Sequence, residues 1–174
     1  MYKITGKMFT EEQISEKVKE LGKQIENDYK GEEVLLVGIL KGANVFLCDL
    51  IRQIDLDVKI DLMSVSSYGS GTESSGTVKI LKDLDADIHN RNVIIVEDII
   101  DSGRTLSNLV KELKVRGPKS LKLCTLLNKP SRRVVDVDVE YIGFEIEDKF
   151  IVGYGIDYAE KYRNLPYIGI VEDV

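Results

Sequence analysis

The sequence contains few of the residues that several common classes of protein require. Among its 174 residues there are two cysteines, three prolines and one histidine, and tryptophan is absent. Two cysteines cannot form a disulfide framework, and because Cys48 and Cys124 each lie in an apolar segment, we expect both to be buried, reduced thiols. The single histidine, His89, lies in a polar turn with no Cys–His pattern around it, which argues against a zinc site and against nucleophilic hydrolysis.

Positive charge and long apolar runs are also scarce. The chain has 24 Lys and Arg against 30 Asp and Glu, which gives a net charge of −6 and a pI near 5.0. Broad affinity for nucleic acid or an anionic membrane is therefore not expected, although a local basic pocket for a phosphorylated small molecule is compatible with this balance. No run approaches the roughly 20 apolar residues of a membrane span, and no N-terminal stretch resembles a signal peptide. We expect a cytoplasmic protein.

Short apolar stretches alternate with amphipathic ones along the chain. Residues 10–13 form a capping-box pattern before apolar residues at helical spacing (Ile14, Val18, Leu21, Ile25), and the continuous apolar run 34–40 is typical of a strand covered on both faces. Further patterns predict helices at 43–54 and 105–115 and strands near 58–62, 77–81, 92–96, 121–127, 141–144, 150–152 and 167–171. This alternation, without repeats or long linkers, predicts a single α/β domain over residues 1–174, with a mostly parallel, twisted sheet flanked by helices on both faces.

Residues 93–106, VIIVEDIIDSGRTL, are the most informative stretch. The apolar run ends at Glu97 and Asp98, and Asp101 precedes Ser102-Gly103-Arg104-Thr105, where a helix is expected to begin. The start of a helix presents free backbone N–H groups and the positive end of its dipole, and a turn with two hydroxyls and a glycine lets the backbone wrap closely around a phosphate. In a parallel sheet such a turn lies beyond the carboxyl ends of the strands, where ligands bind.

The carboxylates beside this anion site need a partner of another kind. Solvated acids in a strand–helix connection are one alternative. Placed after a buried strand, however, Glu97 and Asp98 suit vicinal hydroxyls, a divalent cation, or both. A ribose 5-phosphate carries a phosphate at one end and a diol at the other. The stretch therefore predicts a ribose phosphate site, with the turn on the phosphate and the acids on the diol.

The same stretch resembles the signature of a known family. Its order of four apolar residues, two acids, two apolar residues, Asp and then Ser/Thr-Gly-Lys/Arg-Thr is similar to that of the type I phosphoribosyltransferases, which join a nitrogenous base to 5-phospho-α-D-ribosyl 1-pyrophosphate (PRPP) and release pyrophosphate. Leu40-Lys41-Gly42, Ser67-Tyr68, Lys129 and the stretch from Gly143 to Arg163 resemble the hypoxanthine-guanine branch of this family. The resemblance implies the fold expected above, with a small hood formed by the terminal segments.

The resemblance implies a role for each matching residue. It implies ribose and phosphate binding by Glu97, Asp98, Asp101, Ser102, Gly103, Arg104 and Thr105; pyrophosphate binding by Lys41, Gly42, Ser67, Tyr68 and Arg163; and purine binding by Lys129, Phe150, Ile151 and Asp157. Asp101 is the implied catalytic acid or base at N7 of the purine. Mg²⁺ is the implied cofactor, held by Glu97, Asp98 and, through water, Asp157, since Mg²⁺ takes carboxylate, water and phosphate oxygens. In this family the peptide bond matching Leu40–Lys41 can be cis.

Lys129 bears on which base is used. An ammonium donates hydrogen bonds and accepts none, so it satisfies the 6-oxo group of hypoxanthine, guanine or xanthine but not the amino group of adenine. The resemblance thus implies a purine salvage enzyme that transfers the 5-phosphoribosyl group from PRPP to N9 of a 6-oxopurine, giving IMP or GMP and pyrophosphate. It also implies a homodimer or homotetramer that acts on small molecules, with no nucleic-acid or membrane partner. Preference among the three bases stays open.

Residues 66–76 have no apolar face, and eight of these eleven residues are Ser or Gly. Such a composition predicts a mobile loop, and the resemblance implies a lid that closes over the reacting sugar and keeps water away from it. A plain flexible connection is the alternative.

Two other functions compete with this interpretation. A regulator on the same fold, which senses PRPP or nucleotide and binds RNA or a protein, would need a basic face or an added segment, and the acidic chain shows neither. A phospho-acceptor receiver domain also has an α/β sheet with clustered acids, but its acids should be spread over several strand ends. Here they crowd into one turn.

Overall fold

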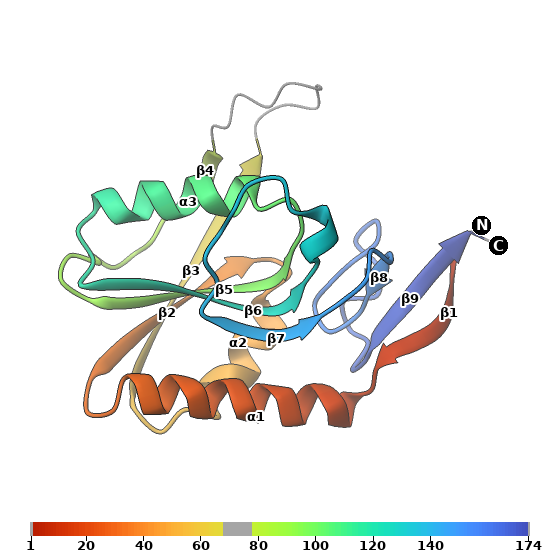
Figure 1. Ribbon diagram of the computed structural model, residues 1–174, viewed down its shortest axis with the longest axis horizontal. Helices are drawn as coiled ribbons and strands as arrows, with labels where there is room; N and C mark the ends of the chain where they lie inside the picture. Colours follow the sequence, from red (N-terminus) through yellow and green to blue (C-terminus); the bar gives the residue numbers. More distant parts are fainter. Residues whose placement is uncertain (1, 68–77, 174) are drawn as a thin grey trace.

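The structure is a computed structural model that describes residues 2–67 and 78–173 (Figure 1). Three α-helices and nine strands follow one another among these residues. In chain order they are β1 (Tyr2–Phe9), α1 (Glu11–Asp28), β2 (Glu33–Leu40), α2 (Asn44–Ile51), β3 (Asp57–Ser67), β4 (Val78–Lys82), β5 (Asn92–Ile100), α3 (Arg104–Val115), β6 (Ser120–Asn128), a 3₁₀ turn (Pro130–Arg132), β7 (Tyr141–Glu145), β8 (Ile151–Val152) and β9 (Ile168–Asp173).

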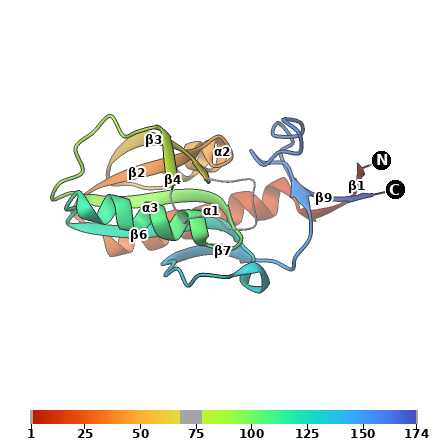
Figure 2. The ribbon, with the colours of Figure 1, turned by 90° about the horizontal axis from the view of Figure 1, so that it is seen from above.

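The larger sheet has six strands in the order β4-β3-β2-β5-β6-β7. All of its neighbours pair in parallel except β4, which is antiparallel to β3 at the edge. Helices α1 and α2 cover one face and α3 covers the other (Figures 1 and 2). The predicted mostly parallel sheet between helical layers is confirmed.

The central strands are apolar on both faces because each face meets a helical layer. On β2, Leu36 belongs to the core beneath α1 and α2, whereas Leu35 and Val37 belong to the core beneath α3. Successive side chains of a strand point to opposite faces, so a strand between two layers reads as an uninterrupted apolar run. The strand predicted at 34–40 is therefore found at Glu33–Leu40.

Helix α1 begins where the capping box predicted. The Thr10 hydroxyl accepts a hydrogen bond from the Gln13 backbone N–H at 3.2 Å, and the Gln13 side chain accepts one from the Thr10 N–H at 2.9 Å. Two N–H groups that a helix start leaves without partners are thus satisfied. The buried side of the helix is formed by the residues predicted from the spacing, Ile14, Val18, Leu21 and Ile25.

The terminal segments form a separate three-stranded sheet in the order β1-β9-β8, placed beyond the carboxyl ends of β5 and β6 (Figure 1). This sheet is the predicted hood. Strand β1 was not expected from the sequence, and it pairs antiparallel with β9, so that Tyr2 lies opposite Asp173. Its residues alternate between exposed and half-buried, and a strand with one weakly apolar face leaves little pattern to detect.

The expected burial of both cysteines is half wrong. Cys124 on β6 is buried, but Cys48 is exposed. Helix α2 turns Phe46, Leu47 and Leu50 toward the core, which leaves Cys48 on its outer side.

Helix α2 is also shorter than predicted, because it ends at Ile51 rather than at residue 54.

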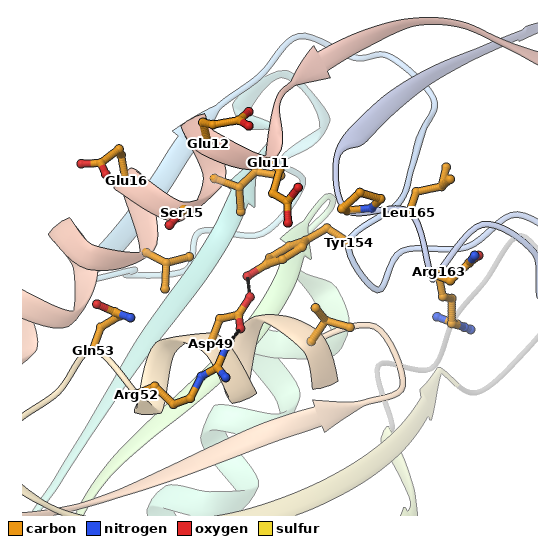
Figure 3. A pocket seen from close by; sticks show the side chains of 15 residues that line it. Glu11, Glu12, Ser15, Glu16, Asp49, Arg52, Gln53, Tyr154, Arg163 and Leu165 are labelled. Carbon is orange, nitrogen blue, oxygen red and sulfur yellow. Dashed lines mark hydrogen bonds and ion pairs between the residues drawn. The ribbon is translucent and has the colours of Figure 1, made fainter.

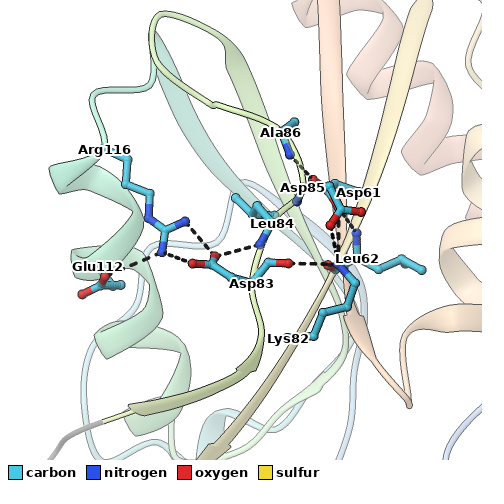
Figure 4. Close-up of polar contacts among 9 residues, drawn as sticks. All are labelled: Asp61, Leu62, Lys82, Asp83, Leu84, Asp85, Ala86, Glu112 and Arg116. Carbon is cyan, nitrogen blue, oxygen red and sulfur yellow. Dashed lines mark hydrogen bonds and ion pairs between the residues drawn. The ribbon is translucent and has the colours of Figure 1, made fainter.

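A buried carboxylate holds the segment that follows the edge strand β4. Asp61 on β3 is 6% exposed, and its oxygens accept hydrogen bonds from the backbone N–H groups of Leu62, Asp85 and Ala86 at 2.7, 2.9 and 3.0 Å (Figure 4). The ammonium of Lys82 lies 3.9 Å away. A buried charge is tolerated when its lone pairs are satisfied in this way.

A second ion pair joins the same return segment to α3. Arg116 donates to both carboxylate oxygens of Asp83, at 2.7 and 3.0 Å, and Glu112 lies 3.7 Å from the same guanidinium (Figure 4). The pKa of Asp83 is lowered by this hydrogen bond from Arg116. Together, Asp61 and Asp83 tie the segment after β4 to the frame that carries the site.

Candidate active site

The predicted site residues converge at the carboxyl edge of the larger sheet. Lys41 and Gly42 follow β2, Asp101 follows β5, and Lys129 follows β6. Strands β2, β5 and β6 are parallel neighbours, so their ends lie side by side. The hood stands over this edge (Figure 1).

The strand–turn–helix stretch is present, with a longer strand than predicted. Strand β5 continues past Val96 to Ile100, because Glu97, Ile99 and Ile100 pair with Thr125, Leu127 and Asn128 of β6. Helix α3 begins at Arg104, one residue before the predicted start. Gly103 precedes it with φ +79°, a backbone conformation that favours glycine. The first N–H groups of α3 therefore open onto the turn 101–104.

The two adjacent acids, Glu97 and Asp98, lie half-buried and point to different sides of the strand end. Glu97 lines a cavity above the turn, whereas Asp98 faces Gly42. Burial raises the pKa of Glu97 well above its usual value, and the neighbouring Asp98 raises it further. Burial likewise raises the pKa of Asp98 to about 6, although hydrogen bonds from backbone N–H groups and the charge of Arg163 oppose the rise. Without a cation beside them, both acids thus hold a proton more readily than exposed carboxylic acids do.

Gly42 is required by its distance from Asp98. A Cβ atom built on Gly42 would lie 1.9 Å from Oδ2 of Asp98, far inside contact distance. The backbone after β2 therefore approaches the carboxylate as only glycine allows. The peptide bond between Leu40 and Lys41, just before it, is cis.

Lys129 is buried between two carboxylates. The residue is 7% exposed, and its ammonium lies 3.8 Å from Asp101 and 3.6 Å from Asp148. Its backbone N–H donates to the carbonyl of Ile100 at 3.0 Å, which fixes the end of β6 against the end of β5. A buried lysine held at this position presents its ammonium beside the turn.

Lys41 and Arg163 are both paired with acids from the hood. The Lys41 ammonium lies 2.9 Å from Glu160, and the Arg163 guanidinium lies 3.1 Å from Glu160 and 3.1 Å from Asp157. Arg163 also donates to the carbonyl of Gly155 at 2.8 Å. Its Nε atom is buried and has no hydrogen-bond partner within the described part of the chain. The segment between β8 and β9 thus brings one cation and two acids against Lys41, which follows β2.

Phe150 immediately precedes β8, and Ile151 is its first residue. Ile151 is buried, but the Phe150 ring is 47% exposed, although it is large and apolar. The ring meets that of Tyr158 edge-on at 5.3 Å between centroids, and that of Tyr2 at 6.5 Å. One part of the ring is supported by aromatic neighbours, and the rest is available for contact.

Two of the cavities near these residues contain predicted site residues. The smaller, about 340 Å³, is lined by Glu97, Asp101, Ser102, Gly103 and Thr105 with apolar neighbours. The larger, about 630 Å³, lies between α1, α2 and residues 163–166, where the Tyr154 hydroxyl donates to Asp49 (Figure 3). Of the predicted site residues, Arg163 alone lines the larger cavity. The chemistry therefore places the site at the smaller cavity.

The donor set suits a metal that shares its coordination with a substrate. No group of three or more His, Cys, Asp or Glu in residues 2–67 and 78–173 could hold a metal ion by itself. Glu97 and Asp98, whose side chains leave the strand end on different sides, each offer carboxylate oxygens, and Mg²⁺ commonly takes one or two carboxylates together with waters and substrate phosphates. These two acids fit such an ion.

One predicted site residue and most of the predicted lid lie outside the described residues. Tyr68 and most of the predicted lid, residues 68–76, are not among the described residues. The backbone of Ser66 and Ser67 belongs to β3, so these two residues continue the strand rather than start the loop. The lid itself stays a prediction.

Sequence comparisons agree with this geometry. The family model described as phosphoribosyl transferase domain matches residues 6–159. The chain belongs to the phosphoribosyl transferase family.

Relatives within the family extend over nearly the whole chain. The hypoxanthine phosphoribosyltransferase of Escherichia coli K12 is 55% identical over 94% of this chain and 93% of its own length. A crystal structure of a Bacillus anthracis hypoxanthine-guanine phosphoribosyltransferase superposes with a TM-score of 0.94 at 55% identity, covering 99% of this chain and all of that one. The bifunctional protein TilS/HprT of Listeria monocytogenes is 53% identical, and the chain spans about a quarter (26%) of its length. The resemblance predicted from the motifs is confirmed.

Several residues of the site were not expected from the sequence. Glu160 and Asp148 pair with Lys41 and Lys129, and Arg133 contacts the backbone of the turn. The partners are far apart along the chain, by 119 positions for Lys41 and Glu160, and no local pattern reports such contacts. A charged side chain near a phosphoribosyl transferase motif is a weak signal on its own.

The lengths and polarity of the helices bear on whether the chain could span a membrane. In the described part of the chain, no helix is long and apolar enough to cross a bilayer.

Proposed function

We propose that this protein transfers the 5-phosphoribosyl group from PRPP to N9 of a 6-oxopurine, giving IMP or GMP and pyrophosphate, with Mg²⁺ as cofactor. The observation that carries the proposal is Lys129, a buried ammonium 3.8 Å from Asp101 at the edge of the phosphate turn. A donor fixed beside a ribose phosphate site selects a base with an oxygen at C6. The names of the relatives, hypoxanthine and hypoxanthine-guanine phosphoribosyltransferases, support the same substrate class.

The turn 101–105 binds the 5-phosphate in this proposal. Backbone N–H groups at the start of α3, with the hydroxyls of Ser102 and Thr105, surround the phosphate, and Arg104 and Gly103 complete the turn. Glu97 and Asp98 bind the ribose hydroxyls on the strand side.

Mg²⁺ would be held by Glu97 and Asp98, with Asp157 contributing through water. The ion supplies charge that offsets the negative charge of the pyrophosphate leaving group. The chain's own acids fix the diol of the sugar, and their burial keeps them from being fully solvated before substrate arrives.

Asp101 serves as the acid or base at N7 of the purine. Its carboxylate is exposed toward the site and lies 3.8 Å from Lys129, so the residue that reads O6 stands beside the residue that handles the N7 proton. As the bond between C1 of ribose and pyrophosphate breaks, N9 attacks and positive charge develops on the purine. A carboxylate near N7 stabilises that charge by taking the proton.

Phe150 stacks on the purine ring, and the backbone of Ile151 reads the edge of the base, with Asp157 nearby. The half-exposed Phe150 ring, supported by Tyr158, suits this role because a stacking ring must be both rigid and open on one face. Selection among hypoxanthine, guanine and xanthine then depends on contacts at C2.

Lys41, Gly42 and Arg163 bind the pyrophosphate group, together with Ser67 and Tyr68 of the predicted lid. The buried Nε of Arg163, which lacks a partner within the described residues, is the donor that an anion there would satisfy. We also propose a cytoplasmic homodimer or homotetramer, as the family resemblance implies.

A direct assay tests the proposal. The purified protein is incubated with PRPP, Mg²⁺ and one base at a time, and nucleotide and pyrophosphate are measured together. We expect IMP or GMP with equal amounts of pyrophosphate, and kcat/KM for adenine lower by at least about 10³-fold, because adenine leaves buried donors facing each other. Equal use of adenine, or pyrophosphate release without nucleotide, would contradict it.

A further inference from the structure

A segment after β6 holds the backbone of the phosphate turn from behind. Arg133 donates from Nε to the carbonyl oxygen of Asp101 at 3.1 Å. The backbone N–H groups of the next residues, Val134 and Val135, donate to the carbonyl oxygen of Ser102 at 2.9 and 3.1 Å. Two successive carbonyl groups of the turn are therefore fixed by residues 133–135.

Fixing these carbonyls also fixes the N–H groups on the other side. A trans peptide unit is planar, and its C=O and N–H point in opposite directions. The carbonyl of Asp101 shares its peptide unit with the N–H of Ser102, and the carbonyl of Ser102 shares its unit with the N–H of Gly103. With both carbonyls turned toward residues 133–135, both N–H groups face away from that segment, toward the side where a ligand would lie.

Arg133 is anchored to the sheet by its second contact. Its Nη2 donates to Oδ1 of Asn128, the last residue of β6, which is 5% exposed. The Asn128 carbonyl in turn accepts from the N–H of Ile146 at 2.9 Å, so this end of β6 is held on both sides. The guanidinium thus spans from a rigid strand end to the turn, and its planar fork suits two acceptors at fixed positions.

The contact between turn and segment is tight. A Cβ atom on Gly103 would lie 2.7 Å from the carbonyl oxygen of Val135 and 3.0 Å from Cδ of Arg133. The turn therefore has little room to move toward the segment, and the hydrogen bonds keep it from moving away. Its conformation is set before any ligand binds.

We propose that Arg133 is a positioning residue that preorganises the N–H groups of Ser102 and Gly103 for the 5-phosphate. The inference rests on the proposed function, because it assumes that the turn binds this phosphate. Arg133 acts through the backbone of the turn, because its Nε–H donates to the Asp101 carbonyl and one N–H of Nη2 donates to Asn128. Preorganisation of this kind raises affinity by lowering the cost of ordering the site on binding.

The test compares a nucleotide with the nucleoside that lacks only the phosphate. Binding of IMP and of inosine is measured by titration calorimetry for the wild type, Arg133→Met and Arg133→Lys. In Arg133→Met we expect IMP affinity to fall about 10- to 100-fold, as for the loss of one or two charge-assisted hydrogen bonds, with inosine affinity changed by less than about 3-fold. Arg133→Lys should fall similarly, because one ammonium cannot hold both acceptors in the arginine geometry.

Controls separate positioning from stability and from charge. Arg91→Met removes a comparably half-buried arginine paired with Glu33 at the opposite end of the sheet, and it should leave the ratio of IMP to inosine affinity unchanged. Should Arg133→Met fail to fold, Asn128→Leu removes the anchor instead, and it should lower IMP affinity selectively but less.

Each failure has its own signature. Equal losses of IMP and inosine affinity in Arg133→Met, or full recovery of IMP binding in Arg133→Lys, overturn the positioning role while the wild type still prefers IMP. A wild type that binds inosine as tightly as IMP overturns the phosphate assignment itself, and the proposed function with it.

Discussion

The ammonium of Lys41 lies 2.9 Å from the carboxylate of Glu160, and the same carboxylate lies 3.1 Å from Arg163. The hydrogen bonds from these two cations lower the pKa of Glu160, so the residue is ionised at neutral pH. Lys41 and Arg163 are the cations proposed for the pyrophosphate group. In the ligand-free protein, a carboxylate therefore contacts both of the cations proposed to bind the substrate anion.

Replacing this carboxylate should strengthen binding of PRPP. Because Glu160→Gln removes the competing charge, we expect KM for PRPP and the inhibition constant of pyrophosphate each to fall about 2- to 5-fold, the modest effect typical of exposed ion pairs. KM for hypoxanthine should not change. Steady-state kinetics with pyrophosphate as product inhibitor measures all three. A rise in KM for PRPP would instead mean that Glu160 holds the two cations in place for the substrate.

Removing the charge of Asp101 should slow the reaction more than it weakens binding. For Asp101→Asn we expect kcat to fall by about 10²–10⁴-fold, the range of general acid–base assistance, with IMP affinity within a few-fold of the wild type. Single-turnover quench measurements report the chemical step without product release. An unchanged single-turnover rate would remove Asp101 from the chemistry.

Lys129 should control the choice between oxo and amino groups at C6. The amide of glutamine both donates and accepts, so Lys129→Gln should lower the preference for hypoxanthine over adenine in kcat/KM by at least about 10-fold. Lys149→Gln changes a nearby exposed lysine, paired with Glu147, and serves as the matched control. The idea fails if both variants retain the preference of the wild type.

Asp98 should make the ligand-free protein less stable as pH rises. Its folded pKa of about 6 exceeds the usual 3.8, so between these values the folded state retains a proton that the unfolded state has lost. The free energy of unfolding therefore falls as pH increases from about 4 to 6 and stays lower above 6. The raised pKa of Glu97 acts in the same direction and extends the fall to higher pH.

The corresponding variant should be more stable and inactive. Asp98→Asn mimics the protonated form, so at pH 7 without Mg²⁺ it should gain on the order of 1–3 kcal/mol in the free energy of unfolding and lose transferase activity. Urea unfolding at pH 4.5 and pH 7 measures the effect, and the gain should shrink to roughly a third at the lower pH, which still lies above the unfolded pKa of 3.8. If Asp98→Asn is less stable than the wild type at pH 7, burial of the charged Asp98 carboxylate does not destabilise the folded protein.

Much of the fold could be predicted because each local signal agreed with the tertiary structure. The apolar run 34–40 predicted a strand covered on both faces, and β2 is such a strand. The capping box at Thr10 likewise predicted where α1 begins. Strand β1 gave no such signal, because its alternation is weak and its partner β9 lies at the other end of the chain. Cys48 shows the converse: an apolar neighbourhood in sequence did not decide which side of α2 the thiol occupies.

The residues of the candidate site likewise fall into those that the local sequence could predict and those that it could not. Glu97 to Thr105 could be predicted because strand, turn and helix start are contiguous in the sequence and their chemistry is local. Arg133 and Glu160 could not, since each acts on a residue far along the chain, Asp101 and Lys41 respectively. The roles of all these residues, Ser67 and Tyr68 included, remain predictions.

A crystal structure of the protein with IMP tests the central claim most directly. We predict the 5-phosphate within hydrogen-bond distance of the backbone N–H groups of residues 102–105, with the purine O6 facing the Lys129 ammonium. A nucleotide found instead in the cavity between α1 and α2, with the turn after β5 empty, would contradict the account.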